Sequence, residues 1–286
     1  MRIGYIFLIL YKQPALLKAI VPKSPILRQY IDVFYVFNTD KTVKFSHLAF
    51  PHTNTAISFF KGVSITRNEF VITIESNSEN NGHIEMLGKY TKPVVVHYEG
   101  GFEEIAIVFK ALGANRFIQE DFHSVAPAFS QAYENTIWKK FAATLFDAGN
   151  KIGAIEDFLL SQWREIPDLQ KIEKALKCFG NKETDYSVAE VAEIAGYNLK
   201  SFQRHFTKHV GCSPAVYKRI ARFRNSLNSK LFAKEFKSLT SITYENNYTD
   251  QSYFIREFNK LTNQNPGKFF RDISLANGEK IVWEIL

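Results

Sequence analysis

Two stretches in the last hundred residues carry side chains of the types that read the edges of DNA bases. Gln203 and Arg204 lie in the first stretch, and Gln251 and Arg256 lie in the second. Arginine can pair with guanine through two hydrogen bonds, and glutamine can pair in the same way with adenine. If both stretches are helices, the sequence predicts two surfaces able to contact bases in a major groove.

A basic segment surrounds the first stretch. Residues 194–234 hold nine lysines or arginines and no aspartate or glutamate. A solvated helix usually interleaves acidic and basic residues four positions apart. The lack of acidic residues here, in a chain of formal net charge +7, favours a polyanionic partner such as double-stranded DNA. The nine residues are Lys200, Arg204, Lys208, Lys218, Arg219, Arg222, Arg224, Lys230 and Lys234.

The two stretches belong to an internal repeat. Residues 202–206 correspond to residues 254–258 at an offset of 52 positions. Lys208 corresponds to Lys260 at the same offset, and Ser213-Pro214 to Asn265-Pro266. Many matched positions under one offset indicate a duplicated unit.

Each copy is predicted to be a helix, a tight turn and a second helix. In the first copy, Ser187 and Glu190 form a capping box that starts a helix. Gly196 suits the sharp turn, and Asn198 can cap the helix that follows. The second helix of this copy is expected near residues 199–209.

The second copy follows the same plan. Ser238 is expected to cap its first helix, Asn246-Asn247 to form the turn, and Thr249 or Asp250 to cap the second helix, near residues 250–261. Between the copies, Ser213-Pro214 is a good helix start and predicts a long spacer helix. Such a spacer could hold the two units about one DNA turn, roughly 34 Å, apart.

Five short motifs mark the two copies. They are Ala195-Gly196-Tyr197, Phe202-Gln203-Arg204-His205-Phe206, Gly211-Cys212-Ser213-Pro214, Asp250-Gln251-Ser252-Tyr253-Phe254 and Arg256-Glu257-Phe258. With these motifs, residues from about 185 to 271 resemble the AraC/XylS family of bacterial transcription regulators. The resemblance implies that the second helix of each unit reads bases.

By position, the resemblance assigns the base contacts of the first unit to Lys200, Gln203 and Arg204, and those of the second to Gln251, Ser252 and Arg256. The surrounding cations are expected to contact phosphates, which adds affinity without sequence information. These expected phosphate contacts are Lys208, Lys218, Arg222 and Lys260.

Three positions depart from the family pattern. Asn247 and Asn263 stand where the family usually has glycine, and asparagine is the residue that best tolerates the left-handed backbone after glycine. Thr243 replaces a small alanine, and its hydroxyl could loosen a helix contact. We therefore expect the second unit to bind DNA more weakly than the first.

The first half of the chain is predicted to be rich in strands. Stretches of β-branched and aromatic residues at 56–60, 70–75, 94–98 and 105–109 read as strands. Turns are expected at Lys61-Gly62, at residues 80–82 and at Gly100-Gly101. This part resembles the small cupin-like barrels that sense ligands or mediate dimerisation.

The expected fold is α+β, in three parts. Residues 1–130 form a cupin-like antiparallel β-barrel or sandwich for sensing or dimerisation. Residues 131–180, whose apolar side chains recur at helical spacing, form a helical connector. Residues 181–286 form an all-α domain with two helix-turn-helix units.

Nothing in the sequence predicts catalysis. His47, His52, His83 and His97 lack the close spacing of a metal site, and Glu103-Glu104 is expected to be a turn or strand-edge pair. No P-loop, nucleophile elbow, zinc-protease or dinucleotide motif is present. We therefore predict no catalytic residue, no metal, no cofactor and no enzyme activity.

Two cysteines, Cys178 and Cys212, exclude a disulfide framework and favour the reducing cytoplasm. The apolar run of residues 3–10 is too short to span a bilayer, so we expect a buried strand there and no membrane partner. Besides DNA, the candidate partners are RNA polymerase, a small-molecule effector and a second copy of the chain.

Two alternatives stay open. The chain could be a cupin-type metal enzyme or a ligand-binding protein with an attached helical module for nucleic acid or for protein interaction. It could also be a scaffold whose helical domain binds only protein.

Overall fold

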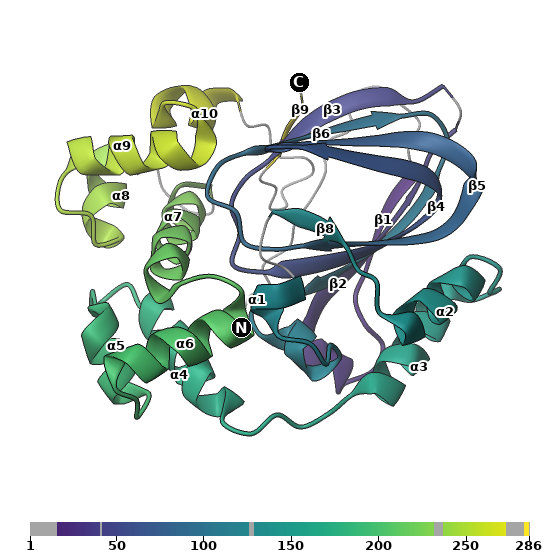
Figure 1. The fold of residues 1–286 in the computed structure, drawn as a ribbon. Coiled ribbons are helices and arrows are strands. Elements are labelled where there is room, and N and C mark those ends of the chain that lie inside the picture. Colours follow the sequence, from purple (N-terminus) through teal and green to yellow (C-terminus); the bar gives the residue numbers. More distant parts are fainter. Residues whose placement is uncertain (1–15, 41, 126–128, 232–236, 273–282, 286) are drawn as a thin grey trace.

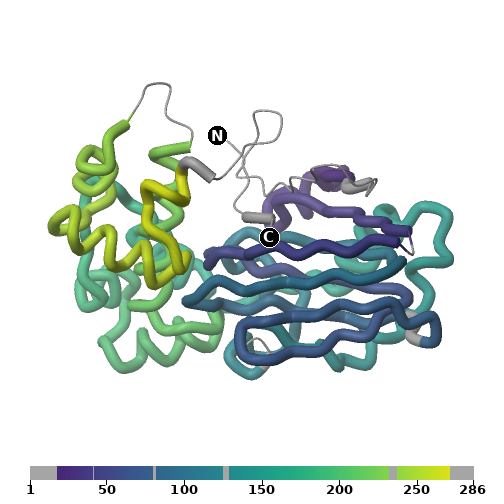
Figure 2. The backbone as a smooth tube through the Cα atoms, turned by 90° about the horizontal axis from the view of Figure 1, so that it is seen from above, coloured from purple at the N-terminus to yellow at the C-terminus, as the bar shows by residue number. Residues whose placement is uncertain are grey.

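The computed structural model describes residues 16–40, 42–125, 129–231, 237–272 and 283–285. The run of residues 3–10, where we expected a strand, lies outside this part. The described residues form a curled sheet followed by a helical region (Figure 1). From above, the helical C-terminal part lies beside the sheet (Figure 2).

A nine-stranded sheet holds the strands of the described residues in the order β1-β2-β7-β4-β5-β6-β3-β9, with β8 paired to β5. Most pairs are antiparallel, as expected, but β5 and β6 run parallel. The strands are β1 (Leu16–Ile20), β2 (Ile31–Asn38), β3 (Lys44–Ala49), β4 (Thr55–Asn68), β5 (Val71–Leu87), β6 (Val94–Glu99), β7 (Glu103–Phe109), β8 (Ser130–Ala132) and β9 (Trp283–Ile285).

Two of the expected turns are wrong. Strand β4 runs through Lys61-Gly62, and strand β5 runs through residues 80–82, so both places lie inside strands. The register between β4 and β5 shifts there, and Gly62 and Gly82 have φ of 79° and 109°. These glycines therefore bend two long strands instead of ending them. The connection between β4 and β5 falls at Glu69, with φ of 49°.

Successive side chains along each strand point to opposite faces of the sheet. Phe59 of β4 and Ile107 of β7 face a buried cluster with Trp138, Leu145 and other residues of the helices that cover that face. Phe59 and Trp138 stack with ring centroids 6.0 Å apart. The covering helices are α2 (Thr136–Leu145) and α3 (Lys151–Gln162), and the short elements nearby are η1 (Leu27–Gln29), η2 (Gly113–Arg116) and α1 (Phe122–Val125).

The helices of the C-terminal region match the predicted plan. We call α5 and α6 the first unit, and α8 and α9 the second unit; α7 joins them. The helices are α4 (Leu169–Gly180), α5 (Val188–Ile194), α6 (Leu199–Val210), α7 (Pro214–Leu231), α8 (Leu239–Glu245), α9 (Gln251–Thr262) and α10 (Pro266–Asp272). No helix in the described part of the chain is long and apolar enough to cross a membrane.

The predicted caps set the ends of these helices. Ser187 and Glu190 form the capping box of α5. The side chain of Asn198 accepts from Ser201 N at the start of α6, and Asp250 accepts from Tyr253 N at the start of α9. Each cap satisfies an amide that has no partner within its helix.

Each unit has its own aromatic core. In the first, Phe202 and Phe206 pack with Val191 of α5, Ile172 of α4 and Tyr217 of α7. Helix α4, which we had assigned to the connector, thus shares the core of the first unit. In the second unit, Phe254 and Phe258 pack with Phe223, Ile242 and Phe269, and with Phe50 from the sheet region.

Candidate DNA-binding face and ligand cavity

The two predicted recognition helices lie at opposite ends of α7. Helix α6 precedes α7, and α9 lies near its far end (Figure 1). Helix α7 has 18 residues, which corresponds to roughly 27 Å at 1.5 Å per residue. The two units are therefore separated by a continuous helix, as the sequence predicted.

All six predicted base-contacting side chains are exposed. The aromatic pairs that fix each helix, Phe202 with Phe206 and Phe254 with Phe258, are buried on the side that packs against the core. In α9, Thr240 donates a hydrogen bond of 3.0 Å to the Gln251 side chain, and the guanidinium of Arg256 lies 5.9 Å from the ring centroid of Tyr253. The six residues are Lys200, Gln203, Arg204, Gln251, Ser252 and Arg256.

The four predicted phosphate contacts fall into two groups. Lys208 and Lys260 are exposed, and each has one carboxylate nearby: Lys208 lies 3.4 Å from Asp121, and Lys260 lies 2.8 Å from Glu257. Lys218 and Arg222 are more covered, and both lie 2.7 Å from the carboxylate of Asp185.

Asp185 holds Lys218 and Arg222 at the junction of the two units. Partial burial alone would raise the pKa of Asp185, but the hydrogen bond from Lys218 and the charge of Arg222 outweigh it and lower that pKa. Lys218 also donates to the carbonyl of Tyr186, and Arg222 lies over the ring of Tyr248. The structure gives these two cations an internal partner; their contact with phosphate stays a prediction.

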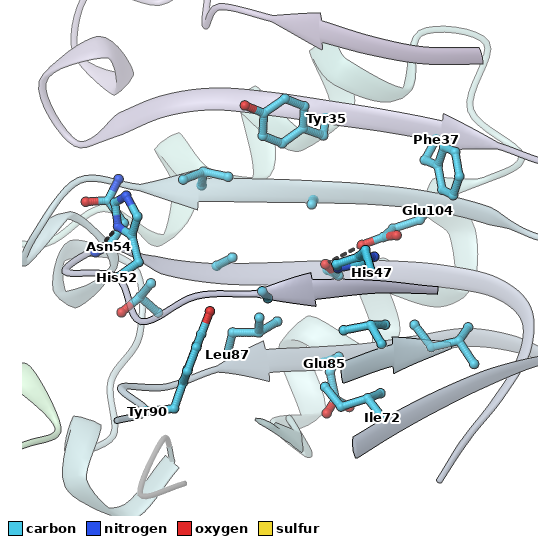
Figure 3. A pocket seen from close by; sticks show the side chains of 18 of the residues that line it. Tyr35, Phe37, His47, His52, Asn54, Ile72, Glu85, Leu87, Tyr90 and Glu104 are labelled. Atoms are coloured by element: carbon cyan, nitrogen blue, oxygen red, sulfur yellow. Dashed lines mark hydrogen bonds between the residues drawn. The ribbon is translucent and has the colours of Figure 1, made fainter. Parts of the chain in front are cut away.

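The second face of the sheet lines a cavity of about 160 Å³. Alternate residues of β2, β3, β4, β6 and β7 point into it, as expected for strands whose neighbours face opposite sides. Figure 3 shows Tyr35 and Phe37 of β2, His47 of β3 and Glu104 of β7 facing the same space. Most of the lining is apolar or aromatic, which is typical of small-molecule sites.

Glu104, the second residue of β7, is partly exposed and lines this cavity, whereas we expected a turn or strand-edge position. Its neighbour Glu103 points the other way and pairs with Lys151 at 2.7 Å. Ser58 donates a hydrogen bond of 2.7 Å to the Glu104 carboxyl group, and Tyr98 donates another. Burial raises the pKa of Glu104 to about 7.

A second carboxylate, Glu85, lines the cavity but is fully paired. Arg67 donates two hydrogen bonds to it, and His83 and Ser130 each contribute one contact. Burial alone would raise the pKa of Glu85, but the hydrogen bonds from His83 and Arg67 outweigh it and lower that pKa. The Glu85 carboxylate therefore has Arg67 as its ion-pair partner within the protein.

The four histidines of the first half do not converge. His47 faces the cavity, and burial lowers its pKa well below the usual value. His52 lies at the other end of the cavity (Figure 3). His83 contacts Glu85, and His97 contacts Ser46 at 2.6 Å. Within the described residues, no group of three or more His, Cys, Asp or Glu side chains has the geometry to hold a metal ion.

Arg224 links the cavity to the helical region. It projects from α7 and donates to the carbonyls of Phe50 and Pro51, at 2.7 and 2.6 Å, where the chain leaves β3. Burial lowers its pKa to about 9, so the guanidinium stays charged at neutral pH. Sequence reasoning had counted Arg224 only as part of the basic segment, because nothing in the sequence reveals which basic side chain turns toward the sheet.

Comparison with known proteins gives a family match for the first half only. Residues 19–128 match a family model described as a domain of unknown function (DUF6597). No curated protein sequence matches the chain.

Several solved structures are similar to parts of the chain. ToxT from Vibrio cholerae is 12% identical, with a TM-score of 0.44, over 83% of this chain and 97% of that one. A transcriptional regulator with an AraC-type DNA-binding domain from Chromobacterium violaceum is 19% identical, with a TM-score of 0.32, over 35% of this chain and 88% of that one.

The C-terminal domain of AraT, a response regulator from Geobacillus stearothermophilus, is 19% identical, with a TM-score of 0.34, over 40% of this chain and 92% of that one. The motifs of residues 185–271 and the two helical units joined by α7 are this chain's own features. By these features the chain is similar to the AraC-type regulators, while its first half matches the domain of unknown function.

Proposed function

We propose that the chain is a sequence-specific DNA-binding transcription regulator that reads two successive major grooves with α6 and α9. One observation carries the proposal: both recognition helices expose glutamine and arginine, and a single helix, α7, joins the two units that contain them. The length of α7, roughly 27 Å, is of the order of one DNA turn, roughly 34 Å.

Selection from a random duplex library tests this function. We expect one enriched motif with two half-elements about 10 base pairs apart. Enrichment of a single half-element would limit base reading to one unit. Absence of any enrichment over bulk DNA would contradict sequence-specific binding and favour the protein-binding scaffold.

The competing enzyme hypothesis has its own test. We propose that the chain is not an enzyme, since the first half offers a mostly apolar cavity and separated histidines. Metal analysis of the purified protein would contradict this if it found stoichiometric iron, zinc or manganese bound to the first half.

We further propose that the cavity is an effector site. Its lining includes Phe50 and Arg224, and both residues also contact the helical region: Phe50 packs in the core of the second unit, and Arg224 belongs to α7. An occupant of the cavity would thus act on groups that hold the two units in place. RNA polymerase and a second copy of the chain stay candidate partners, and a regulator of this kind would act in the cytoplasm.

A further inference from the structure

At one end of the cavity, the Glu104 carboxylate has no lysine or arginine as a partner in the described part of the chain. Among the described residues, the Glu104 carboxyl group has the hydroxyls of Ser58 and Tyr98 as hydrogen-bond partners, and no lysine or arginine forms an ion pair with it. Glu85, by contrast, has an ion pair with Arg67 and a further contact with His83. A buried carboxylate is costly unless a cation pairs with it. Glu104 is therefore the position in the cavity where a bound cation would be stabilised most.

The wall beside Glu104 is aromatic. The rings of Phe45 and Tyr98 stack with centroids 4.7 Å apart, and Tyr98 also stacks on Phe102 at 5.3 Å. Phe37 meets the edge of Tyr98 at 5.8 Å. Aromatic faces attract ammonium groups, and the attraction is larger when water is excluded. The same wall would accept an aromatic or aliphatic hydrocarbon body.

The size of the cavity limits the occupant. A cavity near 150 Å³ with apolar walls can hold a benzene ring, so the volume of about 160 Å³ fits a single ring or a short alkyl chain. A larger ligand would have to displace lining side chains or extend outside the cavity. The apolar lining disfavours sugars and other ligands with many hydroxyl groups.

The charges at the two ends set the orientation of a bound cation. Arg224, which is positive, lies beside Phe50 and Pro51 near His52, whereas Glu104 and His47 lie at the opposite end (Figure 3). An ammonium group is repelled by Arg224 and attracted by Glu104. The head group would therefore lie at the Glu104 end of the cavity, with the hydrocarbon body toward Arg224.

We propose that this cavity binds a small apolar amine, whose ammonium group pairs with the Glu104 carboxylate and lies against the aromatic wall. This proposal names the chemical class of the effector and so rests on the proposed function of the cavity. The binding step is reversible: below neutral pH the Glu104 carboxyl group releases its proton to solvent when the ammonium arrives.

Of the described groups around Glu104, only the Glu104 carboxyl group itself is expected to change its protonation state near neutral pH. Ser58 of β4 and Tyr98 of β6 donate to it, and His47 of β3 is held neutral by burial. Glu85 of β5 is already ionised through Arg67. Because the pKa of Glu104 is about 7, ammonium binding at pH 6 should release close to one proton, and affinity should rise between pH 6 and pH 8.

Calorimetry on the full-length, DNA-free chain tests the proposal with benzylamine, benzyl alcohol and benzoate as probes. We expect benzylamine to bind at least tenfold more tightly than either of the others. Titrations at pH 6 in two buffers of different ionisation enthalpy should show the proton release. Equal binding of benzyl alcohol, preference for benzoate, or no benzylamine binding at millimolar concentration would each overturn the proposal.

Glu104→Gln is the decisive variant, and Glu103→Gln on the outer face of the same strand is its control. Glu104→Gln should weaken benzylamine binding at least tenfold, change benzyl alcohol binding less than threefold and abolish proton release. Unchanged benzylamine affinity in Glu104→Gln would contradict the role of Glu104. If this variant fails to fold, the pH dependence and proton release of the unsubstituted chain still decide the matter. These readouts contain no DNA, so their failure is distinct from failure of the duplex selection.

Discussion

Arg204 and Arg256 occupy equivalent positions of the repeat and are both exposed. We expect Arg204→Ala and Arg256→Ala each to weaken binding to the selected duplex by about 1–3 kcal/mol and to relax the preference at one base position. Binding titrations against duplexes substituted at single positions measure both effects. Lys140→Ala, which removes an exposed charge from α2, is the control and should change neither.

If Arg204→Ala leaves affinity and base preference unchanged, α6 is not the helix that reads bases in the first unit. The same result for Arg256→Ala would restrict base reading to α6. The two variants together thus test each unit separately.

Lys208 is predicted to act on phosphate, so its effect should not depend on sequence. Lys208→Ala should weaken all duplexes alike and reduce the slope of log affinity against log salt concentration by about 1. The measurement is a salt series on the selected duplex and on an unrelated one. A loss confined to the selected duplex would show a base contact instead.

Glu104 should make the stability of the fold depend on pH. Its folded-state pKa, about 7, exceeds the ordinary value of 4.5, so between these pH values the folded chain holds a proton that the unfolded chain has released. The free energy of unfolding should therefore fall by about 3 kcal/mol as pH rises from about 4.5 to about 7. Denaturant unfolding across this range should show a flatter profile for Glu104→Gln than for Glu103→Gln; parallel profiles would contradict the assignment.

Among the elements, the turns of the two units differ in a way that can be measured. Gly196 and Asn247 have φ of 75° and 58°, both left-handed. A Cβ at Gly196 would meet no atom within 4 Å, so Gly196→Ala should cost about 1–2 kcal/mol through the backbone alone. Asn247→Gly relieves the backbone cost but removes the hydrogen bond of 3.1 Å from Asn247 to the carbonyl of Lys182, so we expect a smaller change, below about 1 kcal/mol. Thermal unfolding measures both changes, and a stabilising Gly196→Ala would contradict the turn geometry.

The elements of the helical region could be predicted from the sequence because their signals are local. A capping residue, an apolar stripe and a turn residue lie within a few positions of each other, as with Ser187, Glu190 and Gly196. The bends at Gly62 and Gly82 could not be predicted, since a glycine that ends a strand and one that bends it look alike in sequence. Only the pairing of β4 with β5 separates the two cases.

The effect of Thr243 on its helix could not be predicted from the substitution alone. We expected its hydroxyl to loosen a helix contact. In the structure it is fully buried, and it donates a hydrogen bond of 2.8 Å to the carbonyl of Leu239 within its own helix. The hydroxyl is thus satisfied locally, and the expected weaker binding of the second unit stays a prediction.

For the whole molecule, the order of a strand-rich part and a helical part was predictable, but the contact between them was not. Phe50 enters the core of the second unit, and its ring lies 5.0 Å from that of Phe269. Nothing local to Phe50 distinguishes it from the other phenylalanines of the strands. Its partners are more than 170 positions away in the sequence, and only the folded chain brings them together.

Arg224 should matter for the stability of this contact. Arg224→Ala leaves the carbonyl of Pro51 without its donor and leaves that of Phe50 with the Tyr90 hydroxyl alone, and we expect it to lower the free energy of unfolding by about 1–3 kcal/mol. Asn228→Ala, at an exposed position of the same helix, is the control. Equal unfolding free energies for the two variants would show that the contact contributes little.

Strand β9 returns the chain to its starting domain. It follows the second unit and pairs with β3 through Ile285 opposite His47 and Trp283 opposite Ala49. Strands of the sheet thus lie both before and after the helical region in the sequence, as they would around an inserted domain. Deleting the last few residues would uncover the backbone amides and carbonyls of β3, an open edge that invites pairing with another chain. An affinity tag belongs elsewhere on this protein.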